Sequence, residues 1–164
     1  MMWNWQKKDW PHFVYKKSAL ADLEARLLQQ SGVFLGALRH VSAEDKNTLT
    51  VDLEQLQLAV RRAATVSNEI SRQIRLKLQS EQMQILVEDI EQSNSGQETV
   101  PCTYNGEPMD IGYNAAYVLD MLWQVDTNDV QFQLGTPTSA GIVKPTEQAK
   151  DEDLLMLIMP VRLN

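Results

Sequence analysis

Two predicted helices, each followed by a series of short strands, are the feature that most restricts the folds open to residues 47–164. The first helix spans 53–67, with Leu53, Leu56, Val60 and Ala64 on one face, and the second spans 113–125. A strand, helix and strands unit thus occurs twice, which predicts an α+β fold: two helices packed on one antiparallel sheet. The strands, identified by alternation or short apolar runs between turn signals, are predicted at 47–52, 72–78, 83–91, 99–105, 108–113, 129–135, 139–145 and 154–160.

Residues 1–46 differ in character from the rest of the chain, so we expect them to be a separate unit from a domain over 47–164. They open with an aromatic stretch, WNWQKKDWPHFVY, which we interpret as an extended arm whose rings need a surface to lie on. Ser18 is placed to cap an amphipathic helix that runs to about Val41. A polar connector, SAEDKN, follows that helix.

The formal net charge of −7 is concentrated in the larger unit, because residues 1–47 carry a positive balance. Overall attraction to nucleic acid is therefore not expected, and any contact with DNA needs a local basic face. No run is apolar enough for a membrane span, and a single cysteine fits a reducing cytoplasm, so we expect a cytoplasmic protein without a membrane partner. We interpret Cys102 as a half-buried strand residue. No catalytic, cofactor or metal-binding motif is present, so we expect no enzyme activity, cofactor or metal.

The apolar run LLMLIMP at 154–160, followed by VRLN, is unusual for the last residues of a domain, which are commonly polar and frayed. Leu154 to Ile158 are expected to form a buried strand. Met159 to Leu163 fit either a continuation of this strand or an accessible surface, in which Met and Leu would provide adaptable apolar contacts and Arg162 a directional donor.

Three segments resemble one family in order and in register. VRRAATVSNE at 60–69, YNGEPMDIGYNAAYVLDML at 104–122 and LLMLIMPVRL at 154–163 are similar to the third domain of the bacterial DNA polymerase III beta subunit, the sliding clamp. The resemblance covers about 47–164 and implies a non-catalytic domain of a DNA replication processivity factor. It also implies one wall of a hydrophobic groove that binds peptides of polymerases, the clamp loader and repair proteins. The matching groove residues are Asn114, Tyr117, Thr138, Ala140, Met159, Pro160, Val161, Arg162 and Leu163.

Further roles are implied by the same resemblance. Arg61 and Arg62 lie on the helix that matches the lining of the central hole, where double-stranded DNA passes through the ring, although a solvated face explains each arginine equally well. A full clamp subunit has three such domains, and the second domain supplies the other wall of the groove. The residues matching the edge through which subunits join in a ring are Thr65, Val66, Glu88, Asp89, Glu91 and Glu98.

The first 46 residues are similar to the helical region that precedes many Fic-type AMP-transferase domains, chiefly in the WNWQKKDWPHF arm. The His-Pro-Phe-x-x-Gly-Asn-Gly-Arg loop that Fic catalysis needs is absent. One alternative function is therefore a regulatory or inhibitory partner of a Fic enzyme, acting through Glu69 in a Thr65–Glu69 pattern that resembles a Fic inhibitory helix. A fusion without autonomous function is another, and exchange of the arm between copies is a possible route to a homo-oligomer.

Overall fold

The computed structural model describes residues 12–18, 47–148 and 152–163, and within these ranges it contains two helices and nine strands. The helices are α3 (Leu53–Val66) and α4 (Ala115–Leu122). The strands are β1 (His12–Ser18), β2 (Asn47–Asp52), β3 (Gln73–Leu78), β4 (Gln82–Asp89), β5 (Asn94–Tyr104), β6 (Met109–Asn114), β7 (Asp129–Leu134), β8 (Gly141–Pro145) and β9 (Glu152–Ile158). From β2 onward the order is a strand, a helix and three strands, twice, which confirms the predicted α+β class and its repeat.

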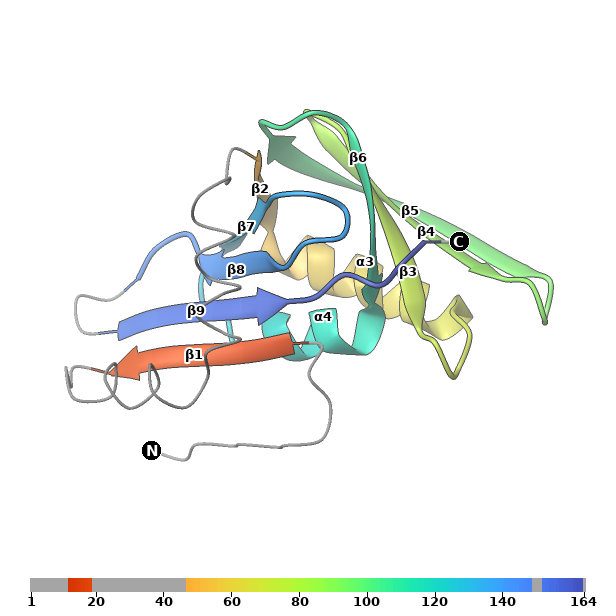
Figure 1. Ribbon diagram of the computed structural model, residues 1–164, viewed down its shortest axis with the longest axis horizontal. Coiled ribbons are helices and arrows are strands. Elements are labelled where there is room, and N and C mark those ends of the chain that lie inside the picture. The colour runs from red at the N-terminus through yellow and green to blue at the C-terminus, as the bar shows by residue number, and fades with distance from the viewer. Residues whose placement is uncertain (1–11, 19–46, 149–151, 164) are drawn as a thin grey trace.

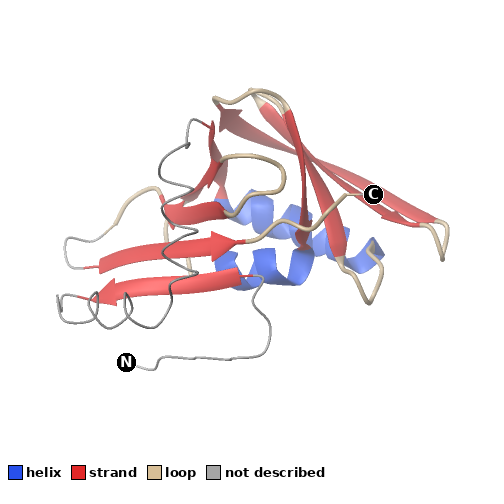
Figure 2. Ribbon diagram, in the orientation of Figure 1, coloured by secondary structure: helices blue, strands red, loops and turns tan. Residues whose placement is uncertain are grey.

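The described strands form one sheet in the order β1-β9-β8-β7-β2-β5-β4-β3-β6, and every neighbouring pair is antiparallel. β2 lies at its centre, paired with β7 along its whole length and with β5 over Leu49–Val51. The sheet curls strongly, so its two halves diverge from β2 (Figure 1). α3 and α4 contact each other and lie on the same side of the curled sheet (Figure 2).

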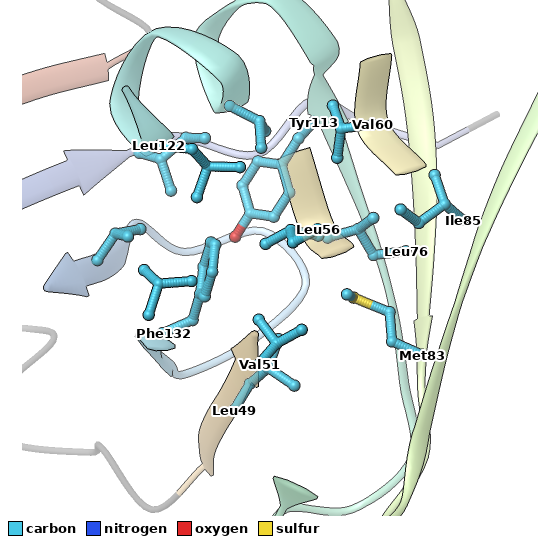
Figure 3. Close-up of a cluster of buried hydrophobic side chains, with 14 of the residues drawn as sticks. Leu49, Val51, Leu56, Val60, Leu76, Met83, Ile85, Tyr113, Leu122 and Phe132 are labelled. Carbon is cyan, nitrogen blue, oxygen red and sulfur yellow. The ribbon is translucent and has the colours of Figure 1, made fainter. Parts of the chain in front are cut away.

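The core lies between the helices and the concave face of the sheet. Ile74, Leu76 and Leu78 are all buried, as their alternation predicted, because successive side chains of a strand point to opposite faces. Figure 3 shows Tyr113 reaching from β6 toward Leu56 and Phe132, so this ring joins the two halves of the sheet to α3.

Both helices begin at side-chain caps that the sequence supplies. Asp52 Oδ1 accepts a hydrogen bond of 2.8 Å from the Gln55 amide and so starts α3. The buried face of α3 consists of Leu56, Ala59, Val60 and Ala63. This face is rotated around the helix from the predicted one, because Leu53 and Ala64 are only partly buried. The two small alanines allow α3 to lie close to the sheet.

In α4 the apolar pattern predicts that the buried residues are Tyr117, Leu119 or Val118, Met121 and Leu122, and this prediction is partly wrong. Val118, Met121 and Leu122 are buried, and Ala115 joins them. Tyr117 is only half-buried, because it lies off the apolar face that these residues form.

The sequence SNSG at 93–96 is a turn signal and predicts a turn before β5, but it lies largely inside that strand. Residues 90–93 form the turn, which is held by the buried carboxylate of Asp89: its Oδ1 accepts from the amides of Glu91 and Gln92 at 3.1 and 3.3 Å. Ser93 takes the positive φ of 53° that completes the turn. The sequence pattern missed this arrangement because a turn signal and a polar edge strand have similar composition.

The extended arm expected in the first segment corresponds to β1 over His12–Ser18. This strand pairs antiparallel with β9, from His12 opposite Ile158 to Ser18 opposite Glu152. Ser18 is thus the last residue of a strand. The predicted helix after it, and the tryptophans before it, lie outside the described residues.

Candidate functional site

The C-terminal tail, residues 159–163, runs from β9, the second strand in the sheet order, to β6, the last one. After β9 the chain crosses to β6, the strand at the opposite end of the sheet order, where Val161 forms an isolated antiparallel bridge with Gly112 (Figure 1). The Val161 amide donates to the Gly112 carbonyl oxygen at 2.9 Å. The tail is therefore held on the body by backbone pairing.

Gly112 is required for the close approach of this tail. A Cβ atom built at this position lies 2.7 Å from Leu163 Cδ2 and 2.8 Å from the Val161 carbonyl oxygen. Both separations are shorter than van der Waals contact, and the second involves the backbone, which cannot move aside as a side chain can. A side chain on residue 112 is incompatible with the observed position of the tail.

Burial changes along the apolar C-terminal run at Met159. Leu157 and Ile158 are buried, whereas the Met159 side chain is 40% exposed. In the remaining tail Arg162 is exposed, and the half-buried residues are Pro160, Val161 and Leu163. The tail thus presents apolar atoms and one guanidinium group to solvent.

The other predicted groove residues approach the tail from two sides. Gly141 pairs with Ile158, so Ala140 and Met159 follow at the same end of the β8–β9 ladder. Ala140 is buried and Thr138 is exposed. On the second side, β6 carries Gly112 beneath the tail and leads two residues later to Asn114, at the start of α4.

Asn114 has a structural role that its sequence motif did not reveal. Its Oδ1 accepts from the amides of Ala116 and Tyr117 at 2.9 and 3.4 Å, which caps α4, and its Nδ2 donates to the Ser71 carbonyl oxygen at 3.3 Å. Tyr117 is half-buried one turn further along the helix. The side chain of Asn114 is therefore fixed in place by the backbone around it.

The two arginines predicted to face DNA have different partners. Arg61 is exposed on α3, and its guanidinium carbon lies 5.6 Å from the ring centroid of Trp123, which is 62% exposed at the end of α4. Arg62 forms a two-point contact with Glu98 of β5 at 2.9 and 3.0 Å. These hydrogen bonds lower the pKa of the Glu98 carboxyl. Arg62 thus has its charge matched by a neighbouring carboxylate, whereas Arg61 lies beside an aromatic ring.

The residues predicted to form the ring edge lie around the end of α3 and the β4–β5 hairpin, and several of them have local structural roles. Thr65 Oγ1 donates to the Arg62 carbonyl oxygen at 2.6 Å, and Val66 lies 3.7 Å from a Cβ built at Gly96. Glu91 accepts a 3.5 Å hydrogen bond from Asn68, which joins the loop after α3 to the hairpin. Glu88 is exposed.

Two further features of this corner were missed from the sequence. Ile70 and Ile90 are 91% and 88% exposed, one in the loop after α3 and the other in the β4–β5 turn. Among the described residues of β5, only Cys102–Tyr104 pair with β2, so the Asn94–Pro101 stretch is paired with β4 alone. The sequence signal for the exposure of Ile70 and Ile90 was that each lies between polar residues next to a turn.

Glu69 does not lie on a helix. α3 ends at Val66 and is followed by Ser67, whose Oγ donates to the Ala64 carbonyl oxygen, and Glu69 is exposed in the turn beyond. The expectation of a Fic-type inhibitory helix at Thr65–Glu69 is therefore wrong, because the helix stops after the second residue of the pattern.

No helix in the described ranges is long and apolar enough to cross a membrane. The described residues also contain no group of three or more His, Cys, Asp or Glu side chains that could hold a metal ion. Cys102 is half-buried, and its burial raises the pKa of the thiol.

Solved structures similar to this chain identify the class of fold. A DNA polymerase sliding clamp from Pseudomonas aeruginosa matches with a TM-score of 0.70 and 32% identity, over 81% of this chain and 36% of that clamp. A sliding clamp from Bartonella birtlesii, solved bound to griselimycin, matches with a TM-score of 0.68 and 28% identity, over 73% of this chain and 31% of that clamp. The fold is that of a sliding-clamp domain.

The amino-acid sequence gives the family. Residues 39–162 match the family described as DNA polymerase III beta subunit, C-terminal domain, and the chain belongs to that family. The beta sliding clamp of Pseudomonas aeruginosa is 37% identical over 112 residues, which are 68% of this chain and 29% of that protein. That of Vibrio cholerae is 30% identical over 152 residues, 93% of this chain and 38% of that protein. The chain thus spans about a third of the length of these curated relatives.

A second family, described only as a domain of unknown function, matches residues 3–71. Its match overlaps that of the clamp family over 39–71. The second family thus covers residues 3–38, which lie outside the match to the clamp family model.

Proposed function

We propose that residues 47–164 act as the C-terminal domain of a sliding clamp, a non-catalytic module of DNA replication that displays part of a peptide-docking surface. The surface consists of Met159, Pro160, Val161, Arg162 and Leu163, with Thr138 and Ala140 on one side and Asn114 and Tyr117 on the other. The observation that carries this proposal is the Val161–Gly112 bridge, which holds the tail in one position against β6. A tail fixed in this way can bind a ligand without first losing conformational entropy.

The chemistry of the surface suits a short apolar peptide with an extended backbone. Met159 offers a flexible, polarisable side chain that is 40% exposed. Arg162 adds an exposed guanidinium that can fix the orientation of the peptide by donating to a carbonyl or carboxylate oxygen. The proposed partners are the clamp-binding peptides of DNA polymerases, the clamp loader and repair proteins.

Contact with double-stranded DNA is proposed only within a ring, because the chain has a net charge of −7. Arg61 is the stronger candidate for a phosphate contact. Arg62 must first give up its two-point contact with Glu98. The open stretch of β5 beside Val66, Glu88 and Glu91 is the proposed ring edge, at which a complementary strand of another clamp subunit adds to the sheet. Asp89 supports this edge from within, as the buried acceptor of its turn.

We also propose the division into a unit at 1–46 and a clamp domain at 47–164, with β1 as a strand that the first unit adds to the second. Support comes from β2, which begins at Asn47 and is the central strand of the sheet. A role as a Fic regulator has no observation in its favour.

The test is a fluorescence anisotropy titration with a labelled Gln-Leu-x-Leu-Phe peptide. We expect saturable binding with a Kd in the micromolar range or weaker, since the second wall of the groove belongs to another domain. Met159→Ala and Arg162→Ala should each weaken binding by about tenfold, the effect of losing about 1.4 kcal/mol. Ile90→Ala, which alters an exposed apolar residue in the β4–β5 turn, is the matched control and should bind like the wild type. Absence of saturation at millimolar peptide would reject the tail as an autonomous docking surface.

A further inference from the structure

β1 carries the N-terminal segment of the chain to the tail surface. Its antiparallel register places His12 opposite Ile158, the residue immediately before Met159. α4 contacts both β1 and β9, so all three elements meet beside the start of the tail. Residues 1–11 therefore join the sheet at the end where the apolar tail begins.

The segment and the surface also match in size and chemistry. Residues 1–11 contain three tryptophans, at positions 3, 5 and 10, together with two methionines. An extended chain of this length can span about 36 Å, more than the roughly 18 Å of the five tail residues. The tail offers a 40% exposed Met159 beside half-buried apolar residues, and large aromatic rings gain most from covering such a surface.

We propose that residues 1–11 dock on the tail surface of the same chain, over Met159, Pro160, Val161 and Leu163, and so act as an internal competitor for peptides. The competition rests on the proposed function, whereas the docking itself does not. Because β1 anchors the segment beside the surface, its effective concentration there is about 1 mM. For a dissociation constant of about 0.1 mM between residues 1–11 and the tail surface, the segment occupies the surface about ten times as often as it leaves it free. This occupancy weakens the apparent affinity for an added peptide by about tenfold.

The docking is tested by tryptophan fluorescence in a Trp123→Phe chain, in which only the three tryptophans of residues 1–11 emit. We expect blue-shifted emission with weak quenching by acrylamide. Adding Met159→Glu should shift the emission to the red and at least double the quenching constant. Ile90→Glu introduces the same charge at an exposed isoleucine in the β4–β5 turn and should change neither quantity. If the emission wavelength and the quenching constant indicate solvent-exposed tryptophans both with and without Met159→Glu, the proposal is overturned.

The occupant is identified by dilution. Docking within one chain gives quenching that is independent of protein concentration over a hundredfold range. Protection lost on dilution, together with a dimer-to-monomer change in sedimentation, would mean that a second copy supplies the segment and would overturn docking in the same chain.

The regulatory effect is tested by the peptide titration with Trp3, Trp5 and Trp10 all changed to Ser, which leaves β1 intact. We expect binding about tenfold tighter than in the unaltered chain. If neither chain binds peptide while the Met159→Glu shift is observed, docking stands and the peptide function fails. If peptide binding is saturable but unchanged by the three substitutions, the proposed competition is refuted.

Discussion

Replacing Gly112 by alanine tests whether the tail is held by close contact with β6. The added Cβ would lie 2.8 Å from the Val161 carbonyl oxygen and 3.1 Å from Val161 Cγ2, so the tail must move away. Overpacking of this kind costs about 1–3 kcal/mol, and loss of the 2.9 Å Val161–Gly112 hydrogen bond adds about 1 kcal/mol. Alanine also lowers the conformational entropy of the unfolded chain, which offsets about 0.4–1 kcal/mol of this destabilisation. We expect a net destabilisation of about 1–3 kcal/mol.

Gly96→Ala is the matched control. Both glycines lie within strands, and no described glycine has a positive φ, so alanine is compatible with the backbone at each. A Cβ at Gly96 meets only Val66, at 3.7–3.8 Å, which is ordinary contact. This variant should therefore be as stable as the wild type or more stable by up to about 1 kcal/mol.

The assay is thermal unfolding followed by circular dichroism, combined with hydrogen exchange of the Val161 amide. Gly112→Ala should lower Tm by about 5–10 °C and accelerate Val161 exchange, while amides in β3 and β4 change only with global stability. If Gly112→Ala and Gly96→Ala have the same Tm and the same Val161 exchange rate, the reasoning about the tail is refuted.

Three further predictions concern single side chains. Tyr113→Phe should preserve stability or raise it by about 1 kcal/mol in urea unfolding, because the buried hydroxyl has no hydrogen-bond partner among the described residues; a loss above 1 kcal/mol would reveal a hidden partner. Asn114→Ala should cost about 1 kcal/mol by removing the cap of α4, and Asn114→Ser should recover most of it in the same measurement. The Glu98 carboxyl should titrate below the ordinary glutamate pKa by NMR and return toward it in Arg62→Gln. Since its folded pKa is lowered, its contribution to stability is present above the unfolded pKa and lost as the pH falls through the folded value; a titration unaffected by Arg62→Gln would contradict this cause.

The elements that could be predicted from the sequence are those whose pattern is local. Ile74, Leu76 and Leu78 alternate with charged residues, so β3 and its buried face follow from period alone. β5 begins earlier than predicted. Asn94 and Ser95 have low strand propensity, so no local pattern indicated a strand there, and they are extended because they pair with β4.

The candidate site was less accessible to sequence reasoning, since its decisive contacts join residues far apart in the chain. The resemblance to the clamp family, rather than the composition of the tail, indicated an exposed surface beginning at Met159. No local signal indicated that Val161 pairs with Gly112, that Arg62 is matched by Glu98, or that Asp89 is buried as a turn acceptor. These depend on which strands become neighbours, and that is decided by the curl of the whole sheet.

The central position of β2 has a consequence for synthesis on the ribosome. β2 emerges first among the strands of the clamp domain, yet its partners are Cys102–Tyr104 of β5 and the whole of β7 at Asp129–Leu134. Hairpins β3–β4 and β4–β5 can form as they emerge, whereas β2 keeps an unpaired edge until β7 has been made. Nascent chains that stall before residue 129 therefore expose the central strand of the sheet, and it is these intermediates that we expect chaperones to bind.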